Sequence, residues 1–171
     1  MKIAIAGTGY VGLSNAILLA QHHDVTAVDV IPEKVDMVNR KESPIADAYI
    51  EDYLKNRELS LTATLDGDSA YRNAELIIIA APTNYDDVTG RFDTRAVESI
   101  LTQIRQAGSK AVVIIKSTIP IGYTKKISAR YPELSILFAP EFLQEGKALY
   151  DNLYPSRIIV GIPQGKEALL P

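Results

Sequence analysis

Several residue types and patterns are scarce or missing in this 171-residue sequence, and each absence excludes a class of protein. There is no cysteine, which excludes disulfides, thiolate metal sites and a cysteine nucleophile within these residues. The sequence contains no run of 18 apolar residues, which is about the length that a helix needs to span a bilayer. The formal net charge is only −3, so there is no electrostatic footprint for nucleic acid or for an anionic membrane. We therefore expect neither nucleic acid nor a membrane as a partner, and no metal site.

Targeting and low-complexity signals are also missing. The sequence enters an apolar run at its second residue, without the charged region, apolar core and cleavage site of a secretory signal. We therefore expect a cytoplasmic protein. There is no internal repeat, and a content of 47% hydrophobic and 23% charged residues is typical of one globular domain with a sizeable core.

The most informative stretch is the first one, where an apolar run over residues 2–6 leads directly into G-x-G-x-x-G. Gly7 permits a tight turn, Gly9 lets backbone approach a diphosphate, and Gly12 lets the following helix pack close to the strand. We predict that this helix begins near Tyr10 and that its free N–H groups face phosphate. The candidate cofactor-binding residues here are Gly7, Gly9, Tyr10, Val11 and Gly12.

An acidic residue ends the second predicted strand. Asp29 stands 22 positions after Gly7, where a dinucleotide fold places the acceptor for a ribose 2′-hydroxyl. A carboxylate there would repel a 2′-phosphate, which favours NAD over NADP. The alternative is a turn residue that caps the helix opened by Pro32. Lys34 could reach the charged edge of a cofactor, but it also fits the exposed face of an amphipathic helix.

Short apolar runs alternate with segments of helical periodicity along the whole chain. The predicted strands are residues 2–6, 25–28, 61–64, 76–81, 111–115, 135–138 and 157–160. The predicted helices begin near Tyr10 and span 32–39, 49–55, 66–73, 94–107 and 123–130, with a polar loop over 82–93. This alternation predicts an α/β fold with a doubly wound parallel sheet, a Rossmann-like dinucleotide-binding domain.

Polar side chains follow successive strands of the predicted sheet. In such sheets ligands lie beyond the carboxyl ends of the strands, so Thr83, Thr118, Glu141 and Glu145 should converge on one crevice with the glycine loop. Each has a structural alternative: Thr83 as the edge of a loop, Thr118 as a helix cap, and the two glutamates as one face of a solvated turn. Their shared placement favours function.

Five segments give the chain its resemblance to a known family. In order and spacing it resembles the amino-terminal domain of nucleotide-sugar dehydrogenases at Gly7-Thr8-Gly9-Tyr10-Val11-Gly12-Leu13, Ser43-Pro44-Ile45, Ala81-Pro82-Thr83, Lys116-Ser117-Thr118-Ile119-Pro120 with Gly122, and Pro140-Glu141-Phe142-Leu143-Gln144-Glu145-Gly146. Tyr154-Pro155-Ser156-Arg157 is most similar to the members that act on UDP-glucose, and less to those acting on GDP-mannose or UDP-N-acetylmannosamine.

The resemblance implies oxidation of UDP-glucose to UDP-glucuronate by two NAD+ through a cysteine thioester, in a homodimer. It implies a boundary too: residues 1–161 form the dinucleotide-binding domain, and 162–171 are a cut end or the start of a linker to a carboxyl-terminal substrate domain. Carried over by motif, the catalytic residues are Thr118, Glu141 and Glu145, and the substrate segment is Glu141, Phe142, Leu143, Gln144 and Glu145. The further cofactor contacts are Val11, Asp29, Lys34, Thr83, Thr118 and Glu145.

The sequence departs from this family pattern because the family's nucleophilic cysteine is absent. The resemblance implies that this cysteine, the Lys, Asn and Asp that accompany it, most of the sugar-nucleotide pocket and the dimerisation helix belong to a carboxyl-terminal part. We therefore expect these 171 residues, on their own and monomeric, to bind NAD without turnover. Three other readings stay open at this point: another NAD oxidoreductase such as a hydroxyacid dehydrogenase, a methyltransferase with a glycine-rich first loop, and a non-catalytic NAD-sensing module.

Overall fold

A parallel sheet forms the centre of the computed structural model, which describes residues 1–88 and 90–163. Within these residues the sheet has six strands in the order β3-β2-β1-β4-β7-β8, and every neighbouring pair is parallel. The strands are β1 (Lys2–Ala6), β2 (Asp24–Val28), β3 (Leu61–Thr64), β4 (Leu76–Ile79), β7 (Val112–Ile115) and β8 (Ser135–Phe138). The order reverses between β1 and β4, which is the doubly wound topology, so the predicted fold class is confirmed.

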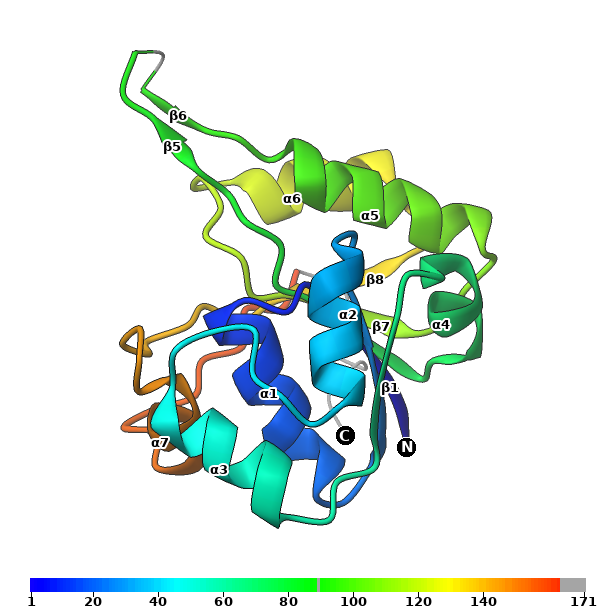
Figure 1. Cartoon of the computed structure of the whole chain (residues 1–171). Coiled ribbons are helices and arrows are strands. Elements are labelled where there is room, and N and C mark those ends of the chain that lie inside the picture. The colour runs from blue at the N-terminus through cyan, green and yellow to red at the C-terminus, as the bar shows by residue number, and fades with distance from the viewer. Residues whose placement is uncertain (89, 164–171) are drawn as a thin grey trace.

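Helices cover both faces of the sheet. They are α1 (Tyr10–Ala20), α2 (Pro32–Asn39), α3 (Ala48–Asn56), α4 (Gly67–Asn73), α5 (Arg95–Gln106), α6 (Tyr123–Arg130) and α7 (Ala148–Leu153). Figure 1 shows α1, α3 and α7 on one side of the sheet and α4, α5 and α6 on the other. Buried side chains from the first three helices belong to one hydrophobic cluster, and those from the other three belong to another. The chain therefore has three layers, with the sheet in the middle.

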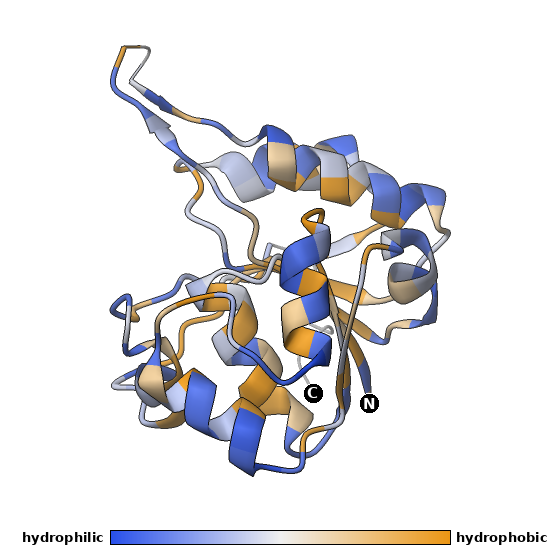
Figure 2. Ribbon diagram, in the orientation of Figure 1, coloured by the Kyte–Doolittle hydropathy of each residue, from blue (hydrophilic) through white to orange (hydrophobic). Residues whose placement is uncertain are grey.

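Strand β1 illustrates why continuous apolar runs become the central strands. Ile3 and Ile5 pack with residues of α1, whereas Ala4 and Ala6 face the core cluster on the opposite side of the sheet. Both faces of β1 are buried, so the side chains that point to either face must be apolar. Burial of an isoleucine of this kind contributes about 2 kcal/mol. Figure 2 accordingly shows hydrophobic segments gathered on the sheet and on the inner faces of the helices.

The predicted polar loop over residues 82–93 holds a short hairpin that the sequence did not indicate. Its strands are β5 (Tyr85–Asp86) and β6 (Arg91–Phe92), and the rings of Tyr85 and Phe92 meet with centroids 5.1 Å apart. Two-residue strands are too short to display an alternating pattern, which is why the hairpin was missed. It projects away from the body of the molecule (Figure 1).

The predicted strand over residues 157–160 is wrong. Residues 157–160 form no strand, and the next residue, Gly161, forms a single antiparallel bridge with Phe138. Ile158, Ile159 and Val160 are exposed. An apolar run indicates a strand only if a partner strand is present to accept its backbone hydrogen bonds. Helix α7 was not predicted, because six residues are too few to establish a helical period.

The predicted domain boundary at residue 161 stays a prediction, and most of the predicted terminal segment, residues 164–171, lies outside the described residues. No helix in the described ranges is both long enough and apolar enough to cross a membrane.

Candidate functional site

The three glycines of the loop between β1 and α1 have different surroundings. Gly7 has a φ of +104°, and a Cβ on it would lie 2.6 Å from the carbonyl oxygen of Ala80. A Cβ on Gly12 would lie 1.9 Å from the carbonyl oxygen of Gly7. A Cβ on Gly9 would instead have no heavy atom within 4 Å. The fold itself therefore requires glycine at Gly7 and Gly12, whereas the space beside Gly9 is open to a group from outside the chain.

The start of α1 completes an anion-binding geometry. Gly9 is the N-cap and provides no side-chain cap, and the first turn, which begins with the half-buried Tyr10 and Val11, contains no acidic residue. The first N–H groups of a helix lack intrahelical partners and carry the positive end of the helix dipole. This helix end, next to the open space at Gly9, therefore fits a diphosphate.

Asp29 directly follows β2 and lies against the glycine loop. The residue is 9% exposed, and its Oδ2 accepts hydrogen bonds from the backbone N–H of Thr8 (2.9 Å) and from the Thr8 hydroxyl. Its Oδ1 accepts the backbone N–H of Ile31 at 3.1 Å. The negative charge of Asp29 also acts on Tyr71: the pKa of this hydroxyl is raised mainly by burial, and to a smaller extent by the charges of Asp68 and Asp29. Asp29 therefore lies beside the glycine loop at the carboxyl end of β2. Lys34 is half-buried in the first turn of α2.

The loops after β4 and β7 are tied together at the same edge of the sheet. The Ser117 hydroxyl donates to the carbonyl oxygen of Ala81 at 2.7 Å, and its backbone N–H donates to Ile79 at 3.2 Å. Thr83 is half-buried in the first of these loops and Thr118 is exposed in the second. Because β4 and β7 are neighbours, the two threonines lie on adjacent loops.

The two predicted glutamates have different environments. Oε1 of Glu141 pairs with Nζ of Lys116 at 2.7 Å, and its Oε2 accepts the side-chain amide of Asn15 at 3.1 Å. The side chains of Glu141 and Lys116 are only 15% and 12% exposed. This contact joins α1 to the ends of β7 and β8, whereas Glu145 is exposed in the bend before α7.

Comparison with known proteins agrees with this geometry. The model of the UDP-glucose/GDP-mannose dehydrogenase family, NAD binding domain, matches residues 1–169. The chain belongs to this family. Its glycine loop, Asp29 and the polar loop ends are therefore parts of an NAD-binding domain.

Relatives of this NAD-binding domain are much longer proteins. The chain is 54% identical over 161 residues to a UDP-glucose 6-dehydrogenase of Streptococcus pneumoniae, covering 94% of this chain and 41% of that protein. It is 48% identical over 163 residues to the Campylobacter jejuni UDP-glucose 6-dehydrogenase, covering 94% of this chain and 42% of the relative. The chain thus spans about two fifths of the length of these curated relatives.

Solved structures of nucleotide-sugar dehydrogenases are similar to this chain in fold. A ternary complex of GDP-mannose dehydrogenase from Pseudomonas aeruginosa matches with a TM-score of 0.84 and 27% identity, over 95% of this chain and 41% of that one. A UDP-glucose dehydrogenase from Pyrobaculum islandicum matches with a TM-score of 0.81 and 30% identity, over 93% of this chain and 40% of that one.

The NAD-binding domain has a cavity of about 290 Å³ beside Glu141. Asn15, Lys116 and Glu141 line it together with the segment after α7, including Tyr154 and Arg157. The Arg157 guanidinium lies 5.2 Å from the centre of the exposed Phe142 ring. Within the predicted substrate segment, Leu143 is half-buried, and the backbone N–H of Gln144 donates to Asp151 at 2.8 Å. The cavity therefore joins this segment to the polar contact at Glu141.

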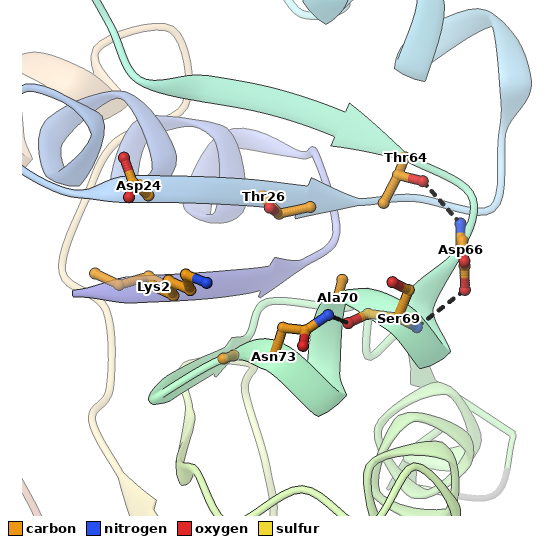
Figure 3. Close-up of a pocket in the computed structure, with 10 residues that line it drawn as sticks. Lys2, Asp24, Thr26, Thr64, Asp66, Ser69, Ala70 and Asn73 are labelled. Carbon is orange, nitrogen blue, oxygen red and sulfur yellow. Dashed lines mark hydrogen bonds between the residues drawn. The ribbon is translucent and has the colours of Figure 1, made fainter.

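A larger hollow of about 510 Å³ lies elsewhere, beside α4, and includes none of the predicted site residues (Figure 3). Its two carboxylates already accept hydrogen bonds within the chain: Asp24 from the Ser60 hydroxyl at 2.8 Å and Asp66 from the Ser69 N–H at 3.0 Å. Among the described residues no group of three or more His, Cys, Asp or Glu side chains could hold a metal ion.

Sequence reasoning assigned no role to Asn15, Lys116 or Ser117. Lys116 and Ser117 directly precede Thr118 at a strand end, which was the available signal. Asn15 lies inside α1 and is 126 residues from Glu141, so no local pattern could have indicated that contact.

Proposed function

We propose that this chain binds NAD+ across the glycine loop, as the NAD-binding domain of a UDP-glucose 6-dehydrogenase. One observation carries the proposal: the open space at Gly9 adjoins the uncapped start of α1 and lies near the carboxylate of Asp29. A dinucleotide combines a diphosphate with a ribose diol, and these two features match it in chemistry and in order. The 54% identity to the S. pneumoniae enzyme supports UDP-glucose over other nucleotide sugars.

Each cofactor contact follows from a position at the carboxyl edge of the sheet. Backbone N–H groups from Gly9 to Gly12 would hold the diphosphate, with Gly7 shaping the turn, and Asp29 would accept a ribose hydroxyl. The remaining proposed cofactor contacts are Tyr10, Val11, Lys34, Thr83, Thr118 and Glu145. NAD+ supplies a hydride acceptor when it is bound.

Catalysis would belong to the longer protein. Oxidation of an alcohol needs a proton acceptor near the hydroxyl, and hydrolysis of an acyl intermediate needs a positioned water. We assign these tasks to Glu141, Glu145 and Thr118, and contact with substrate to the segment from Glu141 to Glu145. Lys116 and Asn15 would hold the Glu141 carboxylate in place. A cytoplasmic location and a homodimer of the longer protein are further proposals.

Ligand-dependent thermal stability of the purified chain tests the proposal. A ligand at about 100 times its Kd stabilises the native state by about 2.7 kcal/mol, or roughly 5–10 °C for a chain of this size. We expect this increase with NAD+ and little change with NADP+. The variant Asp29→Asn should abolish the difference between the two cofactors, whereas Asp36→Asn, an exposed residue on α2, should preserve it.

Absence of any shift with NAD+ would refute cofactor binding by this chain. An equal shift with both cofactors would refute the assignment of Asp29. UDP-glucose is measured in parallel, and we expect no shift from it alone, because only the proposed segment from Glu141 to Glu145 is present to bind it.

A further inference from the structure

Thr8 is a buried residue inside the glycine loop with no role in the proposed function so far. It is fully buried, with 0% exposure, although it lies between two glycines in the loop before α1. Both of its hydrogen-bond donors, the backbone N–H and the side-chain hydroxyl, bond to the same atom, Oδ2 of Asp29. The loop therefore holds this carboxylate by two points on one residue.

These bonds determine which part of the Asp29 carboxylate is available to a ligand. A carboxylate has about four lone-pair positions. Thr8 occupies those of Oδ2, and the backbone N–H of Ile31 occupies one on Oδ1 at 3.1 Å. The available acceptor position is therefore on Oδ1, and the carboxylate cannot rotate without breaking its hydrogen bonds to Thr8.

A cation close to Asp29 in the sequence makes this fixation important. Lys34 is half-buried in the first turn of α2, five residues after Asp29, and an ammonium group binds phosphate well. If the carboxylate could turn aside, Lys34 would be left to attract a 2′-phosphate. Rejection of the wrong ligand requires that the repelling group stay in place.

We propose that Thr8 is a positioning residue that fixes the Asp29 carboxylate and thereby determines the preference for NAD+ over NADP+. The proposal rests on NAD+ binding by this chain. It makes the second residue of the glycine motif, and not the carboxylate alone, part of the discrimination between the two cofactors. A purely structural role for the Thr8 hydroxyl would affect the stability of the chain and the affinity for both cofactors equally.

The ratio of the two affinities separates these roles. Calorimetric titration of the full 171-residue chain with NAD+ and with NADP+ gives Kd for each. Removal of the hydroxyl by Thr8→Val should lower the ratio of the NADP+ Kd to the NAD+ Kd by about tenfold, since a hydrogen bond to a charged group is lost. Thr8→Ser retains the hydroxyl and should keep the ratio within about twofold of the unsubstituted chain.

Thr8→Ala is the second variant, since it removes the hydroxyl without introducing a methyl group beside the buried carboxylate, and the motif tolerates any residue at this position. Circular dichroism confirms that each variant is folded. A folded Thr8→Val or Thr8→Ala chain that binds NAD+ with an unchanged ratio would overturn the proposal. Failure of the unsubstituted chain to bind NAD+ would instead refute the proposed function, so the two results are distinguishable.

Discussion

Single residues at the cofactor crevice fall into two groups, those that the fold requires and those that only a ligand requires. Gly12 belongs to the first group, because a Cβ there would meet a backbone carbonyl oxygen that cannot move aside. Gly9 belongs to the second, because its φ of −77° is open to any residue and its surroundings are empty. Substitution by alanine at each position therefore separates folding from binding.

We expect Gly12→Ala to destabilise the chain by about 3 kcal/mol or more, through overpacking against backbone. Gly9→Ala should cost under about 1 kcal/mol, because alanine is only a poorer N-cap than glycine, yet weaken NAD+ binding by at least about tenfold by occupying the diphosphate space. Urea unfolding and calorimetric titration measure the two effects. If Gly9→Ala bound NAD+ as well as the unsubstituted chain, the diphosphate would have to lie elsewhere.

The carboxylate of Asp47 caps α3 and also accepts a backbone N–H from the first turn of α7. Asp47 is 2% exposed; its Oδ1 accepts the N–H groups of Tyr49 (3.0 Å) and Ile50 (3.1 Å), and its Oδ2 accepts that of Leu149 at 3.4 Å. Helix α7 is further linked to α1 by a 2.8 Å hydrogen bond from Asn152 to Ser14. The segment from Glu141 to Glu145 ends two residues before α7, so the Asp47 carboxylate helps to place this segment beside α1.

The variant Asp47→Ala should lower the free energy of unfolding by about 2 kcal/mol, because two helix ends lose their acceptor and buried N–H groups are left unpaired. Asp66→Ala is the matched control, since exposed Asp66 caps α4 alone, through Ser69 at 3.0 Å. It should cost about 1 kcal/mol. Urea unfolding measures both variants, and equal costs would show that the contact with α7 contributes nothing.

At the scale of the whole chain, the glycine loop and helix start that fit a diphosphate are present, whereas cysteine is absent. The chain spans 41% of the S. pneumoniae relative and contains no cysteine, whereas the resemblance to nucleotide-sugar dehydrogenases implies a mechanism through a cysteine thioester. We therefore expect that NAD+ binding by this chain can be measured without turnover.

We expect the purified chain to bind NAD+ but to form no NADH from UDP-glucose. The first oxidation needs a bound substrate, for which only the proposed segment from Glu141 to Glu145 is present, and the thioester step needs a cysteine nucleophile that is absent. Absorbance at the NADH maximum measures the rate, and the full-length S. pneumoniae UDP-glucose 6-dehydrogenase serves as the positive control. NADH formation that increased in proportion to the concentration of the pure chain would contradict the prediction.

The sequence by itself determined the features that depend on neighbours along the chain. The spacing of Gly7, Gly9 and Gly12 predicts the turn and the start of α1, and the Asp66 cap predicts the start of α4. Helix α2 spans the predicted residues, Pro32–Asn39, because proline at its first position marks the start. Apolar runs likewise predicted the strands buried on both faces of the sheet.

Only the tertiary structure decided the contacts between distant segments. Residues 157–160 have the apolar character of a strand, yet pairing is limited to the bridge at Gly161, because a strand depends on a partner that local sequence does not specify. Asp29 and Thr8 are 21 residues apart, Asp47 and Leu149 are 102 apart, and Asn15 and Glu141 are 126 apart. Local periodicity extends over a few residues, whereas these hydrogen bonds form only after the sheet has brought the loop ends together.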